Sequence, residues 1–257
     1  MAIIKRVIGA VGAALAALFP APRAIADVDR SPSYAAIFHN AFAPDFEVTI
    51  VEQHNGERAT ERVPFRSVTA GRLKLPSGRI AAADPFIALA DTKPLAQHVP
   101  PGIYPVRLAV ADFPSGGLRV AFARVDFKTT KIARWSLALL EGQDIATLKE
   151  DEIFGYGVDA GTGAFFGPEA TKAAARLLDS NPDAWEDWQT EGEANGPKVV
   201  GPHVFLLDLP LEEANAIMFS SGWGDGFYAS WFGYDAAGNV AALVTDFATI
   251  DWSTADW

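Results

Sequence analysis

The sequence predicts a mainly β protein of the α+β class, with antiparallel strands that form either two packed sheets in a sandwich-like arrangement or one strongly curved sheet. Two observations carry this prediction: from residue 46 onward apolar residues recur with a period of two, and turn-forming residues interrupt the runs at short intervals. Residues 168–190 depart from this pattern and predict a small helical insertion. No composition break divides residues 27–257, so we expect a single globular domain.

The alternating runs predict half-buried strands, because successive side chains of a strand point to opposite faces. Within residues 118–127 the alternation changes phase between Phe122 and Val125, which predicts a β-bulge near Ala123-Arg124. The remaining clear runs cover residues 46–50, 106–110 and 134–139. Gly, Pro, Asn and Ser predict turns at 54–56, 76–78, 100–102, 115–117 and 237–239. Short strands at this spacing favour antiparallel pairing.

The helical insertion begins where Pro168 suits the first turn of a helix, and it continues with apolar residues at helical spacing up to Asn181-Pro182. A second short helix is expected over residues 183–190, and a helical turn over 144–149. Residues 191–202 contain charged residues, Gly and Pro without a periodic apolar face. They predict an exposed loop.

The first 26 residues have the order of an export signal. Lys5 and Arg6 precede an apolar run over residues 7–19, and the small-residue triplet Ala24-Ile25-Ala26 follows. The run is shorter than the roughly 20 residues that span a bilayer as a helix. We therefore expect a cleaved Sec-type signal peptide at residues 1–26, an extracytoplasmic location, periplasmic or secreted, and no membrane attachment after cleavage.

Composition narrows the classes of function. The 257-residue chain has a formal net charge of −11 and contains no cysteine. A surface this acidic repels nucleic acid and anionic lipid, so neither is an expected partner. The absence of cysteine removes thiol nucleophiles, disulfides and Cys-ligated zinc. The composition is compatible with a soluble protein that attracts a basic partner or a divalent cation.

Two glycine-rich segments hold the polar residues of greatest interest. In the segment 220–228, Gly222, Gly224 and Gly226 alternate with Trp223 and Asp225, between runs that predict strands. No helix follows, which argues against a phosphate-binding loop. One interpretation is a bulged hairpin in which Asp225 accepts hydrogen bonds from the backbone. The other places an exposed aromatic ring and a carboxylate beside a cleft, a combination suited to sugars or peptides.

The second segment, 155–163, ends a predicted strand with Asp159-Ala160-Gly161-Thr162. If the two segments fold side by side, Asp159 and Asp225 share one pocket, which Asp84 or Asp246 could join. Such carboxylates bind Ca²⁺ or Mg²⁺ or divide acid and base roles. In the alternative, each caps a turn or pairs with an arginine; the candidate arginines are Arg79, Arg107 and Arg119.

Other catalytic templates have little support. The four histidines show no zinc-binding spacing, and no Gly-x-Ser-x-Gly motif occurs. Ser221 could act as a nucleophile only if His98 or His203 approached it in the fold. Trp252 and Trp257, in the acidic tail, are expected to hold the C-terminus against the body.

Five sequence blocks occur in one order and resemble a known family. They are Arg79–Phe86, Val99–Val106, Gly155–Gly163, Ser220–Tyr228 and Val244–Phe247. Over about residues 71–247 the chain is similar to the bacterial proteins grouped as domain of unknown function 4241. The resemblance implies no activity, since the family has none assigned. Family members often carry Cys and then Met-Asp after the glycine at position 163, whereas Ala164 follows here, so the resemblance implies no thiol chemistry.

These observations lead to two hypotheses of function. The first is an exported module that binds an extracytoplasmic protein or a small molecule. The second is a hydrolase or divalent-metal-dependent enzyme that uses a cluster of Asp side chains, with Asp159 and Asp225 as metal ligands. No cofactor is evident, other than a possible divalent cation such as Ca²⁺ or Mg²⁺. Candidate catalytic residues are Asp84, Asp159, Asp225 and Asp246, and candidate ligand-binding residues are Tyr104, Thr162, Ser221, Trp223 and Tyr228.

Overall fold

The computed structural model describes residues 32–54, 57–149 and 152–257, so the predicted signal peptide at 1–26 and the predicted turn at 54–56 fall wholly or partly outside the described residues. The helices are α2 (Pro32–Asn40), α3 (Pro85–Ala88), α4 (Pro168–Ser180), α5 (Ala184–Val199) and the 3₁₀ turn η2 (Ile145–Thr147). The strands are β1 (Glu47–His54), β2 (Glu57–Leu75), β3 (Ala81–Ala83), β4 (Gly102–Phe113), β5 (Gly117–Asp126), β6 (Arg134–Leu137), β7 (Tyr156–Val158), β8 (Thr162–Phe166), β9 (Leu206–Leu211), β10 (Ala214–Ser220), β11 (Gly226–Tyr234) and β12 (Val240–Asp246).

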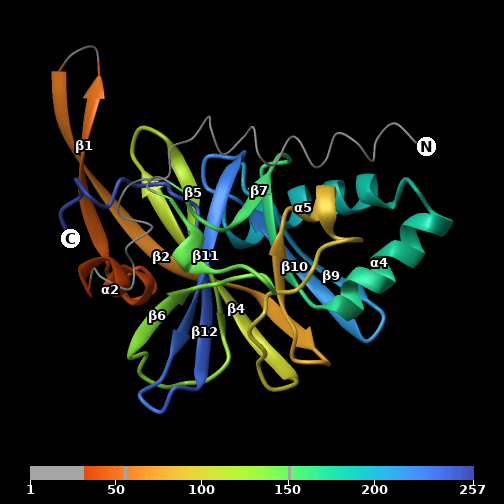
Figure 1. Ribbon diagram of the computed structural model, residues 1–257. Helices are drawn as coiled ribbons and strands as arrows, with labels where there is room; N and C mark the ends of the chain where they lie inside the picture. Colours follow the sequence, from red (N-terminus) through yellow and green to blue (C-terminus); the bar gives the residue numbers. More distant parts are fainter. Residues whose placement is uncertain (1–31, 55–56, 150–151) are drawn as a thin grey trace.

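The strands form two antiparallel sheets, as the alternating pattern predicted (Figure 1). The large sheet has the order β1-β2-β4-β5-β12-β11-β6, with β7 paired to β11, and it is strongly curved. The small sheet has the order β3-β8-β10-β9. The mainly β fold class is therefore confirmed, with both sheets present and the large one curved.

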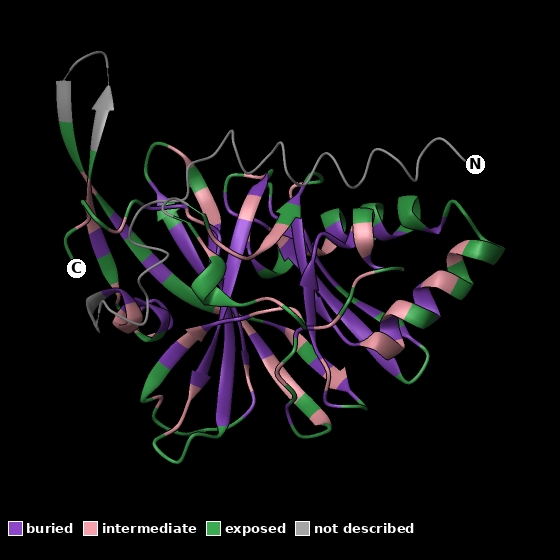
Figure 2. Ribbon diagram, viewed as in Figure 1, coloured by how far each residue is buried: buried purple, intermediate pink, exposed green. Residues whose placement is uncertain are grey.

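The molecule is layered, with helices on the outer faces of both sheets (Figures 1 and 2). One apolar cluster joins residues of both sheets, including Leu108 of β4 and Phe219 of β10. A second lies on the outer face of the large sheet beneath α2, and a third joins the outer face of the small sheet to α4 and α5. Strands β8, β10 and β12 are therefore buried along nearly their whole length on both faces, not half-buried.

The predicted bulge is present in β5, close to its expected position. In the ladder between β4 and β5, Ala109 pairs with Phe122 whereas Val110 pairs with Val120, so Ala121 is the extra residue. The Ala121 carbonyl accepts a hydrogen bond from the backbone N–H of Phe247 at 2.9 Å. The bulge therefore lies two residues before the expected position.

The predicted loop at 191–202 is wrong, because α5 continues to Val199. The buried positions of this helix recur every four residues, and Ala184, Trp188, Gly192 and Gly196 form the stripe. Glycine adds nothing to an apolar pattern, so the second half of the stripe was not visible. The glycines allow the backbone of α5 to lie directly against neighbouring residues. A Cβ on Gly196 would lie 1.4 Å from the Val204 carbonyl oxygen.

The glycine-rich segment 220–228 is a crossover between sheets and not a hairpin. Strand β10 pairs with β8 and β9, whereas β11 pairs with β12, β6 and β7. Gly222 and Gly224 have φ values of +55° and +118°, as their predicted role in a tight turn requires. The segment thus carries the chain from the small sheet to the large one.

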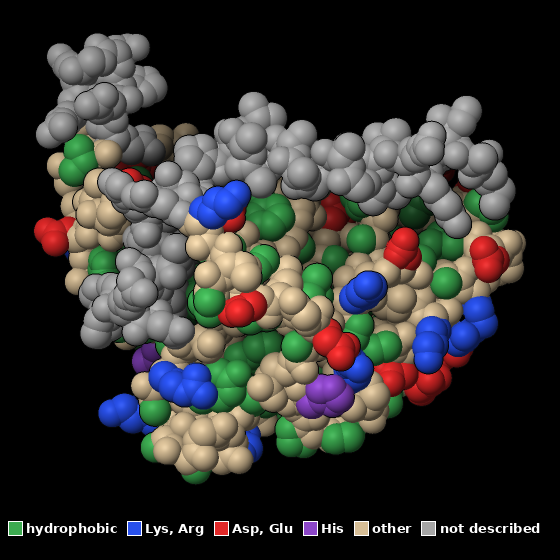
Figure 3. Space-filling view, viewed as in Figure 1, with side chains coloured by type: hydrophobic (Ala, Val, Ile, Leu, Met, Phe, Trp, Pro, Cys, Tyr) green, Lys and Arg blue, Asp and Glu red, His purple; other side chains and the backbone are tan. Residues whose placement is uncertain are grey.

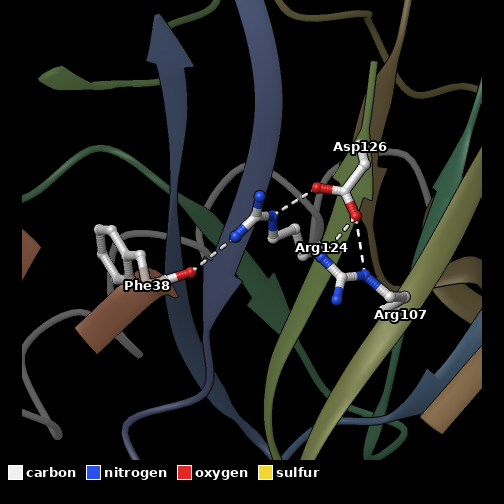
Figure 4. A network of polar contacts seen from close by, with 4 residues as sticks. All are labelled: Phe38, Arg107, Arg124 and Asp126. Atoms are coloured by element: carbon white, nitrogen blue, oxygen red, sulfur yellow. Dashed lines mark hydrogen bonds and ion pairs between the residues drawn. The ribbon is translucent and has the colours of Figure 1, made fainter. Parts of the chain in front are cut away.

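Helix α2, which the sequence pattern did not predict, is held onto the large sheet by aromatic packing and a buried polar network (Figure 4). The Arg124 guanidinium is buried; it donates to Asp126 Oδ1 at 2.7 Å and to the carbonyl of Phe38 at 3.1 Å. Arg107 donates to the other Asp126 oxygen at 2.8 Å. The network ties the last turn of α2 to β4 and β5.

The C-terminal tail packs on the body, as expected for its two tryptophans. The Trp252 ring stacks on Phe122 with centroids 5.6 Å apart, and Trp257 lies 6.5 Å from the ring of Phe46. Backbone hydrogen bonds between Asp256 and Thr49 add the tail to the edge of β1. None of the described helices has the length and apolar character needed to cross a membrane.

Candidate functional site

Asp84 holds two loops together. One carboxylate oxygen accepts the N–H of Phe86 at 3.0 Å and so caps α3, and the other accepts the N–H groups of Asp159 and Ala160 at 2.9 and 2.8 Å. Burial raises the pKa of Asp84 although these backbone hydrogen bonds lower it. Both oxygens are engaged by the backbone, which matches the turn-capping interpretation.

The two glycine-rich segments lie side by side, as one of the hypotheses required. Asp225 Oδ1 accepts the N–H of Gly161 at 3.0 Å, and the N–H of Ser221 donates to the Gly161 carbonyl at 3.0 Å. Asp159 and Asp225 are both exposed. The backbone N–H groups of 159, 160 and 161 are thus all bound by the carboxylates of Asp84 and Asp225.

Asp246 lies apart from these residues, on the outer face of the large sheet beneath α2. It is 2% exposed, and it accepts hydrogen bonds from the Tyr34 hydroxyl at 2.5 Å and the N–H of Ala248 at 2.7 Å. Burial raises the pKa of Asp246 to about 6, against the lowering effect of these hydrogen bonds.

The four candidate carboxylates therefore do not open into one cleft. Asp84 and Asp246 are buried on different elements, and only Asp159 and Asp225 face solvent. Among residues 32–54, 57–149 and 152–257, no three His, Asp or Glu side chains are placed to hold a metal ion together. Of the three candidate arginine partners, Arg107 pairs with Asp126 and not with a candidate carboxylate.

Three of the predicted ligand-binding residues direct their hydroxyls to nearby backbone. Ser221 and Tyr228 both donate to the Gly224 carbonyl, at 2.9 and 2.8 Å, and Thr162 donates to that of Ala160 at 3.1 Å. The buried Ser221 hydroxyl is part of the crossover turn. These side chains fix the shape of the two glycine-rich segments.

The other two predicted ligand-binding residues lie on the surface in different places. Trp223 is 52% exposed, packs its ring on Phe113 with centroids 5.1 Å apart, and donates its indole N–H to the Thr249 carbonyl at 3.2 Å. Tyr104 donates to the carbonyl of Pro100 and packs edge-on against Phe127.

A hollow lies between α5 and the glycine-rich segment around Gly161, and we call it the α5 groove. Its volume is about 650 Å³, within the range of small-molecule sites. One wall is a stripe of α5 adjacent to the buried stripe. The lining residues are Phe86, Ala160, Gly161, Thr162, Trp185, Gln189, Glu193, Pro197, His203, Val204, Phe205 and Ser220.

A smaller cavity of about 210 Å³ adjoins the α5 groove and extends it toward Trp223. Both cavities are lined by Gly161, His203, Val204 and Ser220. At its far end the guanidinium of Arg119 lies 4.5 Å from the centroid of the Trp223 ring. We refer to this part as the Trp223 cavity.

Backbone strain occurs where the two cavities meet. His203 has a φ of +61°, in the left-handed region that costs an L-residue roughly 1 kcal/mol or more. Its neighbour Val204 is the residue against which Gly196 packs. Strained backbone of this kind is common at functional sites, where the surrounding packing enforces it.

Sequence reasoning found only part of this surface. Of the ligand-binding candidates, Thr162 lines the α5 groove and Trp223 lines the adjoining cavity. The sequence pattern predicts a loop at Glu193 and a short helix at Gln189, with no role for either side chain, and it offers His203 only as a zinc ligand or a base. The available signal was the four-residue spacing of Trp185, Gln189, Glu193 and Pro197, which places them on one helix face.

Comparison with known proteins identifies the family of this chain but gives no activity or ligand. The comparisons with curated proteins and with solved structures give no match. A family model described as a protein of unknown function, DUF4241, matches residues 73–245, a range that contains every residue lining the α5 groove. The chain belongs to the DUF4241 family.

Proposed function

We propose that this protein is an exported interaction module that binds a ligand or a partner segment in the α5 groove. The observation that carries the proposal is the groove itself, with its extension into the Trp223 cavity. An exposed aromatic side chain lines each cavity, Trp185 at 44% in the α5 groove and Trp223 at 52% in the Trp223 cavity. A large ring left in water beside a concave surface that combines apolar and polar groups is a common feature of binding sites.

Charge on the rest of the surface gives no competing site on the face seen in Figure 3. Acidic and basic side chains are interspersed there, without a large patch of one sign. The net charge of −11 therefore acts as a general field that favours basic partners. Shape and local chemistry in the groove are the better guide to what is bound.

Export is the second part of the proposal, and it is supported by the order of basic, apolar and small residues in the first 26 positions. Expression of the full chain in a bacterial host tests it. We expect a periplasmic or secreted product whose mass corresponds to a chain beginning at Asp27. A full-length product retained in the cytoplasm would contradict it.

Binding is tested by a thermal-shift screen of the purified protein against short peptides, mono- and disaccharides, and Ca²⁺ and Mg²⁺. We expect at least one class to raise the melting temperature, and Trp185→Ala to abolish that increase. Trp257→Ala is the matched control, because Trp257 is similarly exposed, at 40%, and lies outside the groove. Stabilisation that survives Trp185→Ala would move the site elsewhere and contradict the proposal.

A further inference from the structure

We infer that the α5 groove recognises an organic cation, held between aromatic side chains and the Glu193 carboxylate. This inference rests on the proposed function and adds the chemical class of the ligand. The class includes a free small cation and the Lys or Arg side chain of a partner protein. Both present a positive charge on an apolar or flat group, and aromatic rings with a carboxylate recognise that combination.

Aromatic side chains from three separate segments line the groove. Phe86 follows the Asp84 cap of α3, Trp185 lies in the first turn of α5, and Phe205 precedes β9. The rings of Phe86 and Phe205 are 5.6 Å apart and nearly perpendicular, at 80°. This edge-to-face contact fixes the two rings relative to each other. An aromatic surface attracts a cation through its ring quadrupole.

Glu193 supplies the negative charge in this groove. The Gln189 side-chain N–H donates to Glu193 Oε1 at 3.1 Å, from one turn earlier on the same face of α5. This contact orients the carboxylate and leaves its second oxygen available to a ligand. No described Lys or Arg forms an ion pair with Glu193, and the groove lining contains neither residue type.

The two ends of the joined hollow carry opposite charges, Arg119 in the Trp223 cavity and Glu193 in the α5 groove. Arg119, which lies over Trp223, forms no ion pair with any carboxylate in the described part of the chain. A cation in the joined hollow is therefore repelled from the Trp223 end and attracted to the Glu193 end. The acidic chain as a whole adds to the attraction.

A titration with matched charged and neutral probes tests this inference. The cationic probes are tetramethylammonium chloride, N-acetyl-arginine amide and an Ac-Gly-Gly-Arg-Gly-Gly amide peptide; the neutral probe is N-acetyl-citrulline amide, which keeps the shape of arginine. Binding is followed by NMR at the indole N–H of Trp185 and by calorimetry, at constant ionic strength. We expect the arginine amide to bind about tenfold more tightly than the citrulline amide.

Two variants of α5 test whether Glu193 is the carboxylate that binds the cation. Glu193→Gln should weaken cation binding about tenfold, whereas Glu191→Gln, an exposed acid of α5 outside the groove lining, should change it less than about twofold. Equal losses in the two variants would show a general field effect and overturn the inference. Tighter binding of the peptide than of the amide identifies a partner segment as the source, and the reverse identifies a free cation.

The outcomes separate this inference from the proposed function. If the citrulline and arginine amides bind equally and Trp185→Ala abolishes both, the groove is a binding site but not a cation site. If no cation binds at millimolar concentration, the inference fails regardless of the groove. If cations bind and Trp185→Ala has no effect, both the groove and the inference fail.

Discussion

Helices cover the outer faces of both sheets, but α2 and α5 do so with different side chains. Helix α2 and the residues just after it place large rings on the large sheet, including Phe38, which contacts Trp135 and Trp231 at 5.1 and 5.0 Å. Helix α5 lies on the small-sheet side through Gly192 and Gly196, where added Cβ atoms would overlap Phe205 and Val204. Rings fill much of the first interface. At the second, Trp188 contributes one ring, and at Gly192 and Gly196 the helix backbone itself lies against the Phe205 ring and the Val204 carbonyl.

This difference explains why a groove lies beside α5. When glycines let a helix lie close to its neighbours, the stripe of residues next to the buried stripe, one position later in the sequence, also faces those neighbours. Trp185, Gln189 and Glu193 occupy that stripe and line the groove. At α2 the polar groups are instead enclosed, with Arg124 and Asp246 almost fully buried. One helix therefore seals its sheet face, and the other leaves a surface that a ligand can reach.

The largest expected effect is at the glycine contact. Gly196→Ala adds a Cβ that meets the Val204 carbonyl oxygen at 1.4 Å, and no side-chain rotation relieves a clash with backbone. We expect a loss of at least about 3 kcal/mol in the free energy of unfolding, measured by urea titration. Glu191→Ala, an exposed change on the same helix, should cost less than about 0.5 kcal/mol. A stable Gly196→Ala variant would mean that α5 does not pack through its glycines.

The second largest loss in the free energy of unfolding is expected in the polar network under α2. Arg124→Met removes the charge that pairs with Asp126 and leaves the Phe38 carbonyl without a donor, while Arg107 still pairs with Asp126. We expect a loss of about 3 kcal/mol, from urea unfolding followed by tryptophan fluorescence.

The matched control for this network is an exposed ion pair. Arg62→Met breaks the pair with Glu47, in which the Arg62 side chain is 71% exposed, and should cost less than about 1 kcal/mol. Similar losses for the two arginines would show that burial beneath α2 gives Arg124 no special role.

The same comparison shows what sequence patterns can and cannot predict. Alternation revealed the strands because it records the burial of single residues, and Pro168 marked the start of α4 correctly. The second half of α5 was missed because Gly192 and Gly196 bury backbone and contribute no apolar side chain. A pattern built on side-chain hydrophobicity does not detect a contact that forms because the residue has no side chain.

The candidate site was predictable only in its local parts. Capping by Asp84 is a local property of Asp before Pro85, whereas the contact of Gly161 with Asp225 was expected only on the condition that the two glycine-rich segments fold side by side. The α5 groove joins Phe86 to Glu193, residues more than a hundred positions apart. Their proximity depends on the order of strands in the small sheet, which local spacing does not encode.

The buried carboxyl group of Asp246, beneath α2, should make the stability of the protein depend on pH. Burial raises the pKa of Asp246 from 3.8 to about 6, so between these values the native state binds more protons than the unfolded chain. The free energy of unfolding therefore falls as pH rises from about 4 to 7, by about 2–3 kcal/mol through this group. Asp246→Asn should remove that fall and be about 2 kcal/mol more stable than the wild type at pH 7.5.

A second variant gives the opposite change. Tyr34→Phe removes the hydroxyl that donates to ionised Asp246, so the pKa should rise further, and the loss of stability toward neutral pH should become larger and extend to higher pH. Urea titrations at pH 4, 5, 6 and 7.5 measure both. Parallel pH profiles for the wild type and Asp246→Asn would exclude ionisation of Asp246 as a cause of the dependence.

The smallest effect on stability is expected in the open groove, where residues available to a ligand contribute little to folding. Trp185 is 44% exposed, so Trp185→Ala should cost less than about 1 kcal/mol in urea unfolding, far below the 3–5 kcal/mol typical of a buried tryptophan. Val199→Ala, equally exposed on α5 but outside the groove lining, is the reference for a surface change. A loss of several kcal/mol at Trp185 would instead make it part of the core, and the contrast between a sealed face at α2 and an open one at α5 would no longer hold.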